Sequence, residues 1–271
     1  MSSMLNNLHV INWINSLQIT MTDSGYAELG TEWCRTDVRS PYTRIYYIHH
    51  GNGYAYHDGV KTIFKEGYMY MIPIGFHYDY GCYEKIDQLY FHITITQPNG
   101  YDLFSQCNKI YELPVDKNEI ERLVLLYRSP DMVDALSIAC CLYRDVAAFI
   151  TEADMEAKPA FAYSEMIQKL FPIIRNNLSS KLTIQHLATE MRCSTSTLTK
   201  RFRIEMEMTL GSYIDSMLFQ KAQQLLLFTD LSICEISDML RFCDQFYFSR
   251  YFKQHQNETP SHYRKRLKAS V

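Results

Sequence analysis

Two short stretches in the last third of this 271-residue chain carry side chains suited to reading a polar surface. The first holds Ser196, Thr197, Thr199, Lys200 and Arg203, and the second holds Gln245, Phe246, Tyr247, Ser249, Arg250 and Lys253. Guanidinium and amide groups pair with the edges of guanine and adenine, cations and hydroxyls bind phosphates, and an aromatic ring can contact a thymine methyl. For either stretch alone, the solvated face of an ordinary helix is the more common explanation.

The two stretches occupy equivalent places in an internal repeat. Leu182 aligns with Leu231 at an offset of 49, and after one inserted residue near Cys243 the alignment continues at an offset of 50, from Ser194 with Asp244 to Tyr213 with Tyr263. A match restored by a single insertion indicates two copies of one small unit. Doubling a DNA-reading unit lets one chain reach two grooves of a duplex.

Each copy is expected to fold as a helix, a short turn and a second helix. Capping residues precede the four helices, and apolar residues recur at helical spacing behind the polar stretches. The caps are Thr183, Ser194, Ser232 and Asp244, and the inward residues include Leu198, Phe202, Met206, Ile236, Met239, Leu240, Phe248 and Phe252. Residues 211–228 predict one long helix between the copies, which would set the spacing of two reading heads that need about 34 Å on one duplex.

Composition and charge agree with a folded protein that has one basic part. Residues 164–271 hold 15 Lys+Arg against 10 Asp+Glu, whereas the whole chain has a net charge of −3. A basic C-terminal part suits DNA, although chance variation of solvated charges explains the asymmetry equally well. The eight cysteines form no C-x-x-C pair and are interpreted as free thiols. The sequence shows neither a secretion signal nor an apolar run long enough for a membrane span, so a cytoplasmic location without a membrane partner is expected.

Residues 181–268 resemble the double helix-turn-helix domain of the AraC/XylS family of bacterial transcription regulators. The resemblance is carried by the motifs Lys221-Ala222-x-x-Leu225-Leu226, Leu231-Ser232-Ile233-x-Glu235-Ile236, Tyr247-Phe248-Ser249-Arg250-x-Phe252-Lys253 and Thr259-Pro260-x-x-Tyr263-Arg264. It implies base contacts from Ser196, Thr199 and Lys200 and from Gln245, Phe246, Tyr247 and Arg250. Arg192 and Arg241 stand where the family usually has glycine, which leaves the turn geometry open and makes both residues candidates for phosphate contacts.

The N-terminal part predicts short β-strands. Runs at 44–48, 54–57, 60–64, 69–72 and 88–96 are rich in aromatic and β-branched residues, with a turn expected at Gly51–Gly53 and a hairpin at Asp58-Gly59. Tyr47-Ile48-x-x-Gly51-x-Gly53 and Gly67-x5-Pro73-x-Gly75-x-His77 resemble the cupin-like sensor domain of AraC-type regulators. Tyr42 and Arg44 lie where metal-binding cupins carry ligands, so we expect neither a metal nor a cofactor.

The resemblance implies a small-molecule effector, for which carbohydrate is one class that stacked aromatic rings suit. The candidate binding residues are Tyr46, Tyr54, Tyr56, His77 and Tyr90. The alternative for each tyrosine is an ordinary place in the core or on the surface.

The chain is therefore interpreted as an α+β protein of two domains. Residues 1–150 form a cupin-like effector-sensing and dimerisation barrel with trailing helices at 116–127 and 131–150, residues 151–163 a linker, and residues 164–271 the all-α DNA-binding domain. An apolar stripe on the second trailing helix predicts a homodimer seam or packing against the barrel. The expected partners are double-stranded promoter DNA, the effector and, for an activator, RNA polymerase. The alternatives are a regulator whose barrel only dimerises and a cupin enzyme, for which no metal set or nucleophile–base pair is found.

Overall fold

The computed structural model describes residues 17–97, 99–155 and 163–268. The chain divides into two compact units, one formed by residues 18–95 and 102–157 and the other chiefly by residues 158–271. We call them the β unit and the helical unit and describe each by itself. Among the described residues, no helix is both long enough and apolar enough to cross a bilayer.

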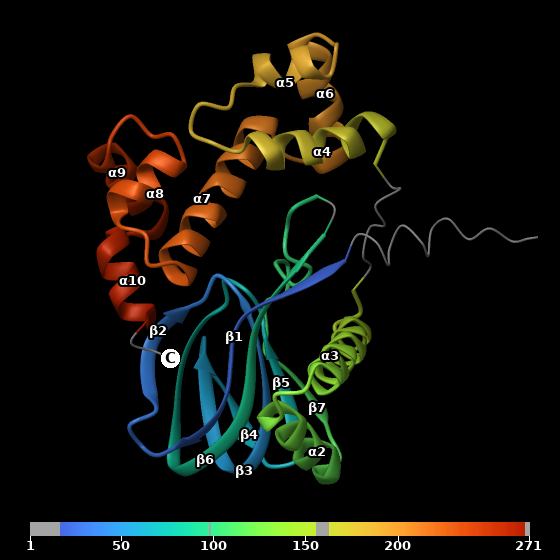
Figure 1. Cartoon of the computed structure of the whole chain (residues 1–271), viewed down its shortest axis with the longest axis vertical. Coiled ribbons are helices and arrows are strands. Elements are labelled where there is room, and N and C mark those ends of the chain that lie inside the picture. Colours follow the sequence, from blue (N-terminus) through green and yellow to red (C-terminus); the bar gives the residue numbers. More distant parts are fainter. Residues whose placement is uncertain (1–16, 98, 156–162, 269–271) are drawn as a thin grey trace, which may run out of the picture. The chain divides into compact units, whose positions relative to one another are not determined.

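The β unit is built on one seven-stranded sheet (Figure 1). Its strands are β1 (Gln18–Leu29), β2 (Cys34–Arg39), β3 (Thr43–His57), β4 (Val60–Lys65), β5 (Tyr68–Ile72), β6 (His77–Thr96) and β7 (Tyr111–Pro114). The long strands β3 and β6 pair antiparallel with each other, while β5 and β4 pair with β3 and β2 pairs with β6. The expected β-rich N-terminal domain is confirmed.

One predicted turn is wrong and one is confirmed. Residues 51–53 do not reverse the chain, because β3 continues through them with register shifts against β6 on either side of Gly51. Gly51 has φ +75, and a Cβ at this position would lie 2.1 Å from the Lys85 carbonyl oxygen. Glycine therefore lets β3 and β6 approach each other closely at a bulge. Asp58 and Gly59, with φ values of 46 and 82, form the two-residue turn between β3 and β4.

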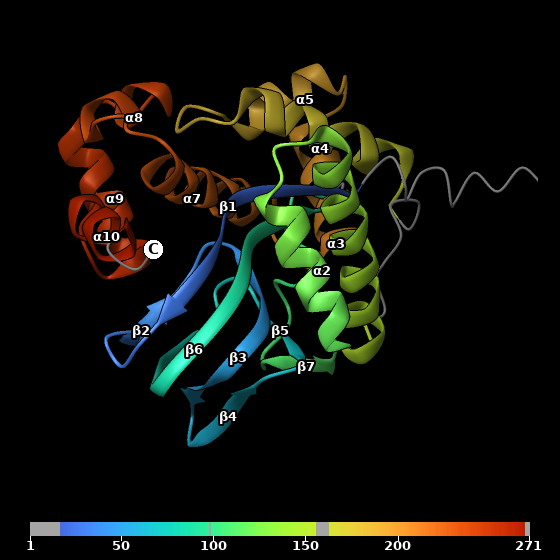
Figure 2. The same cartoon turned by 60° about the horizontal axis from the view of Figure 1, so that its bottom comes forward.

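The sheet buries both of its faces along β3. Alternate residues such as Tyr46 and Ile48 join an aromatic core with residues of β5 and β6. Tyr47, on the opposite face, donates a 2.5 Å hydrogen bond to Asp145 of α3. That face lies beside α2 (Lys117–Arg128) and α3 (Met132–Glu152), which run next to each other in Figure 2. Burial on both faces explains why residues 45–48 of this strand form a continuous apolar and aromatic run.

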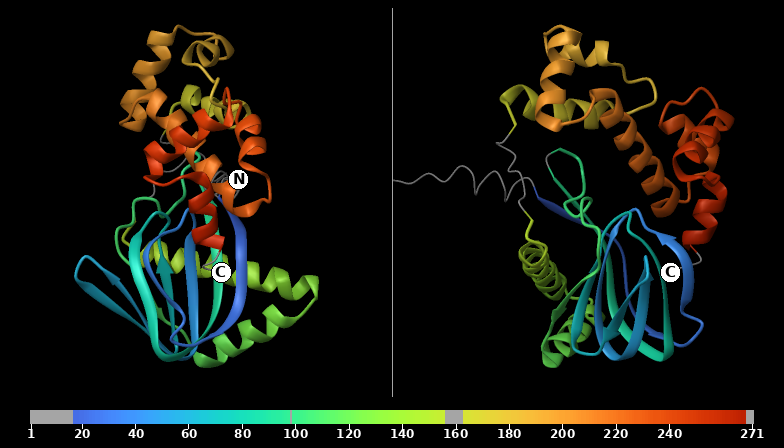
Figure 3. Two further views of the ribbon diagram at one scale, coloured as in Figure 1. Left: turned by 90° about the vertical axis from the view of Figure 1, so that its left-hand side faces the viewer. Right: turned by 180° about the vertical axis from the view of Figure 1, so that it is seen from behind.

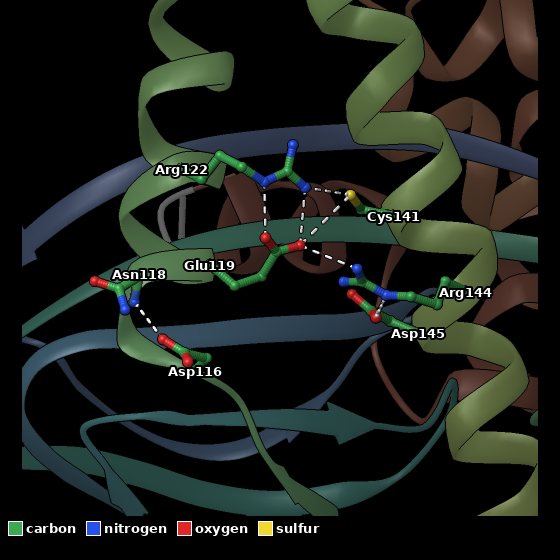
Figure 4. A network of polar contacts seen from close by, with 7 residues as sticks. All are labelled: Asp116, Asn118, Glu119, Arg122, Cys141, Arg144 and Asp145. Carbon is green, nitrogen blue, oxygen red and sulfur yellow. Dashed lines mark hydrogen bonds and ion pairs between the residues drawn. The ribbon is translucent and has the colours of Figure 1, made fainter.

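Ion pairs fix α2 to α3 (Figure 4). Glu119 of α2 accepts from Arg122 Nε at 2.7 Å and from Arg144 Nη1 at 3.0 Å, and Arg144 also donates to Asp145. The hydrogen bond from Arg122, reinforced by Arg144, lowers the pKa of Glu119 to about 2. Asp145 is thereby held in place to accept from Tyr47, so the network links both helices to the sheet.

The helical unit contains α4 (Glu165–Asn177), α5 (Ile184–Glu190), α6 (Thr195–Met206), α7 (Leu210–Phe228), α8 (Ile233–Met239), α9 (Gln245–Gln256) and α10 (Pro260–Lys268). Two hydrophobic cores lie at the two ends of α7, as Figure 3 shows for the helices around it. The first half of α7, with Tyr213 and Met217, belongs to the core of α4 to α6. The second half, with Ala222 and Leu226, belongs to the core of α8 to α10.

We predict that Gly51→Ala destabilises the β unit far more than Gly59→Ala. Both positions have positive φ, which costs an L-residue about 1–2 kcal/mol, but a Cβ at Gly51 would lie 2.1 Å from Lys85 O whereas nothing lies within 4 Å at Gly59. The clash should add about 1–3 kcal/mol. Urea unfolding followed by tryptophan fluorescence measures the difference, and equal losses for both variants would contradict the close approach.

Candidate nucleic-acid interface

In the first helix-turn-helix copy, a tight turn connects α5 to α6. Thr183 caps α5 by accepting from the His186 amide, and Ser194 caps α6 by accepting from the Thr197 amide at 3.0 Å. Leu198 and Phe202 are fully buried against α4, α5 and α7. Fixing these two residues turns the opposite side of α6 towards solvent.

The second helix-turn-helix copy, formed by α8 and α9, repeats this construction. Ser232 and Glu235 form a capping box at the start of α8, and Asp244 caps α9 by accepting from the Tyr247 amide. That backbone hydrogen bond is the main reason why the pKa of Asp244 is lowered. Phe248 and Phe252 are fully buried, as are their equivalents in α6. All four predicted caps are therefore confirmed. Met239 was predicted to face the core but is 54% exposed, because the burial of Ile236 and Leu240 turns it outward.

The eleven candidate contact residues separate into two groups. Nine of them are exposed: Ser196, Thr197, Lys200, Arg203, Gln245, Phe246, Tyr247, Arg250 and Lys253. Thr199 and Ser249, which are equivalent in the repeat, are half-buried and donate their hydroxyls to the carbonyls of Thr195 and Gln245, each at 2.8 Å. The exposed set thus combines cations, amide, hydroxyls and two aromatic rings on α6 and α9.

Arg192 and Arg241 adopt the backbone conformation of the glycines that they replace. Their φ values are 52 and 56, in the left-handed region that costs a side-chain-bearing residue about 1–2 kcal/mol. Although arginine stands in place of glycine, the left-handed turn is therefore kept in both helix-turn-helix copies. Both side chains are exposed directly before the capped starts of α6 and α9. A cation there can reach the phosphates beside a helix that enters a groove.

Several contacts that hold the two helix-turn-helix copies together could not be predicted from the spacing of residues in the sequence. The Ser180 amide donates to Leu240 O at 2.9 Å, joining the segment before α5 to the end of α8. Arg264 donates to Leu226 O at 2.8 Å and to Leu231 O at 2.6 Å, tying α10 to the segment between α7 and α8. Tyr251 of α9 donates to the Asp215 carboxylate of α7 at 3.0 Å. These bonds tie α9 and α10 to α7 and join the segment before α5 to α8.

The candidate effector residues of the β unit do not form one group. Tyr46 and Tyr90 are direct partners in the pairing of β3 with β6. Tyr54 is half-buried, with its ring 5.1 Å from Tyr83, and Tyr56 is 45% exposed. His77 lies at the surface, 2.7 Å from an Asp37 carboxylate oxygen. Tyr78 and Tyr80 alternate along β6 as the sequence indicated, and both are buried. Sequence reasoning did not consider Arg44 for ligand binding, although its period-two spacing with Tyr46 along β3 was an available signal.

The described part of the chain contains no group of three or more His, Cys, Asp or Glu residues able to hold a metal ion. All eight cysteines are free.

Comparison with known proteins finds a family match within the helical unit. A family described as a helix-turn-helix domain matches residues 187–266. The Msm operon regulatory protein of Streptococcus mutans is 31% identical over 131 residues, which make up 46% of this chain and 46% of that protein. The HTH-type transcriptional activator RhaR of Salmonella dublin is 32% identical over 106 residues, which make up 39% of this chain and 38% of that protein. The matches thus span less than half the length of these curated relatives.

A solved structure of similar fold covers both units. Apo ToxT from Vibrio cholerae strain SCE256, a single-substitution variant, aligns with 92% of this chain and 97% of its own, with a TM-score of 0.51 and 13% identity. At that identity the likeness shows the fold alone, a β-rich part followed by paired helix-turn-helix units.

The repeat, its capped helices and these matches identify residues 187–266 as a helix-turn-helix domain. More particularly, the chain resembles, over less than half of its length, an operon regulatory protein and a transcriptional activator of the helix-turn-helix type.

We predict that Arg192→Gly stabilises the helical unit but weakens DNA binding. Glycine relieves the left-handed strain, for a net gain of about 0.5–1 kcal/mol, whereas loss of one phosphate contact lowers the salt dependence of binding by about one ion. Glu207→Gly is the matched control, since Glu207 also has a left-handed φ of 57 but carries no cation. Thermal unfolding and DNA titrations across a salt series separate the two effects. Unchanged DNA affinity for Arg192→Gly would remove Arg192 from the interface.

Proposed function

We propose that this chain is a cytoplasmic regulator that reads a promoter through α6 and α9. The observation that carries the proposal is the repeat of one capped, polar, exposed helix at each end of α7. Two such helices on one rigid connection suit successive major grooves of a single duplex. The eleven residues of α6 and α9 supply the contacts, with Arg250 and Gln245 suited to guanine and adenine edges.

The β unit, in this proposal, senses a small molecule and joins two copies of the chain. An effector that binds one arrangement of the dimer more tightly than another shifts the population of arrangements and so changes which half-sites are spanned. If the outcome is activation, RNA polymerase is a further partner. The β unit supports a binding role through its polar, aromatic interior, which an ordinary apolar core does not need.

We expect Arg250→Ala to weaken binding to the chain's own upstream DNA by about 10- to 100-fold, because a guanidinium–guanine pair contributes about 1–3 kcal/mol of discrimination. Competition titrations with unrelated DNA, repeated across a salt series, measure specific and non-specific affinity together. Lys169→Ala is the control, since Lys169 is an exposed cation of α4 outside both reading helices.

Footprinting of the same complexes tests the whole proposal. The expected result is a protected stretch of about two helical turns per protomer. Equal loss of specific and non-specific binding in Arg250→Ala would reduce Arg250 to a phosphate contact. Binding that unrelated DNA removes completely, with and without added cell extract, would contradict a sequence-specific regulator.

The dimer is proposed to form along α3. Val133 is 63% exposed, Leu136 57% and Tyr143 47%, and these residues follow one another at helical spacing. An exposed apolar stripe of this kind is typical of a helix that packs against a second copy.

We therefore expect Leu136→Glu to convert the dimer to monomer, because it places a charge in the centre of the stripe. Ala135→Glu adds the same charge to an exposed neighbouring position and should leave the dimer intact. Light scattering after size-exclusion chromatography distinguishes the two states. A wild-type monomer at micromolar concentration, or a Leu136→Glu dimer, would contradict this seam.

A further inference from the structure

An arginine is buried inside the β unit, and no acidic side chain among the described residues pairs with it. Arg44 of β3 is only 2% exposed and lies among aromatic side chains. Its Nε and Nη2 donate to Ser40 Oγ at 3.1 and 2.9 Å, its Nη1 to the Tyr46 hydroxyl at 2.7 Å, and its Nη2 also to the Tyr42 hydroxyl at 3.4 Å. The guanidinium carbon lies 5.4 Å from the centre of the Tyr42 ring and 6.0 Å from that of Tyr80. Every one of these neighbours is neutral.

The charge of Arg44 is therefore not balanced by direct contact. Within the described residues, no carboxylate forms an ion pair with it. The acidic residue that feels its charge is Asp23, whose pKa is lowered first by a hydrogen bond from His92 and only last by Arg44. Asp23 lies 3.2 Å from His92 Nδ1, and its side chain remains 29% exposed. Burying an ion costs several kcal/mol unless a counter-ion compensates it, so an unpaired buried guanidinium calls for a specific explanation.

The same place has more hydrogen-bond donors than acceptors. One of the two Nη1 protons of Arg44 has no acceptor among the described residues. Tyr46 already accepts from Arg44, so its own hydroxyl proton is available, and the buried Tyr78 hydroxyl has no partner in the described chain. Burial raises the pKa of Tyr78 well above its usual range and the charge of Arg44 opposes that rise, so the phenol is neutral, can donate and lies within reach of the guanidinium's field.

We propose that the β unit holds its ligand by an anionic group, a carboxylate or phosphate, bound at Arg44 with Tyr46 and Tyr78 as further donors. This proposal deepens the effector-sensing function proposed above and rests on it. A carboxylate or phosphate carries a negative charge and several acceptor oxygens. It therefore complements a site that has a buried positive charge and more hydrogen-bond donors than acceptors. A neutral sugar leaves the charge of Arg44 uncompensated, and each of its hydroxyls brings a proton that needs an acceptor of its own. The ligand class is therefore a small organic acid or phosphorylated compound in preference to an uncharged carbohydrate.

Aromatic rings supply the apolar side of this site. Trp33 is half-buried, with its ring centre 4.5 Å from Tyr80 and 6.3 Å from Tyr46. It lies in the short segment between β1 and β2, next to the residues that surround Arg44. Because Arg44 itself is closed off from solvent, an anion must displace part of this aromatic cover to reach it. Ligand binding would thus be coupled to the position of β1 and β2, which is what a sensor requires.

The experiment uses the purified full-length chain in thermal unfolding and calorimetric titration at constant ionic strength. The probes are formate, succinate, inorganic phosphate and glucose 6-phosphate, with chloride, succinamide and glucose as controls. At least one anion should raise the Tm saturably, whereas its neutral counterpart should not. Arg44→Met should weaken that binding by about thirty-fold or more, since truncating one partner of a buried charge pair is costly.

Two further variants keep the test decisive. Arg39→Met removes an exposed arginine of the same unit and should bind the anion as wild type does. Arg44→Lys retains the charge without the two-pronged geometry, and it should fold yet bind weakly. The Tm of ligand-free Arg44→Met should be unchanged or higher, because an uncompensated charge has been removed.

The results that would overturn the anion site are clear. They are the absence of stabilisation by every anion beyond that of chloride, or equal stabilisation of wild type and Arg44→Met. Stabilisation by glucose alone would refute an anionic ligand while leaving effector sensing intact. Footprints of ligand-free Arg44→Met on its DNA test the regulator separately, so failure of the anion site and failure of the proposed function are distinguishable.

Discussion

The helical unit depends on one helix that is buried along both halves of its length. Tyr213 and Met217 of α7 complete the core of the first helix-turn-helix, and Ala222 and Leu226 complete that of the second. Neither three-helix core is closed without its half of α7. A helix rises about 1.5 Å per residue and is stiff, so sharing it converts two small, separately marginal cores into one unit with a defined spacing between α6 and α9. Hydrogen bonds from Ser180, Arg264 and Tyr251 then join the two helix-turn-helix copies and tie α9 and α10 to α7.

The β unit is stabilised differently, because its central strand β3 has buried residues on both faces of the sheet. One face of β3 supplies an aromatic interior, and the other contacts helices that an ion-pair network fixes in place. The interior is not an ordinary apolar core. It holds a guanidinium, several phenols and a neutral imidazole, since burial lowers the pKa of His92 to about 4. Such polar groups are costly to bury, and proteins that retain them generally use them to bind or to specify structure.

The local features of the helical unit were predictable to a large extent from the sequence. Caps, helix lengths and buried faces follow from residues three and four positions apart, and such spacing is visible without tertiary information. The failures came where a distant contact decides. Met239 matched the apolar period but is exposed, because Ile236 and Leu240 alone are enough to fix α8. Gly51 to Gly53 resembled a turn, but pairing with residues of β6 that are 29 or more positions away keeps the strand extended through a bulge.

The sequence by itself determined the helix-turn-helix repeat and the polar faces of α6 and α9, because both follow from the spacing of residues close together in the chain. It also supplied Arg44 and the tyrosines around it. Only the tertiary structure decided that Arg44 is buried beside neutral partners, that Tyr46 and Tyr90 are neighbours, and that Tyr54, Tyr56 and His77 lie apart from them. The physical reason is that burial and charge balance depend on which strands pair and in which register. A shift of one residue exchanges the faces of a strand, so no local pattern specifies them.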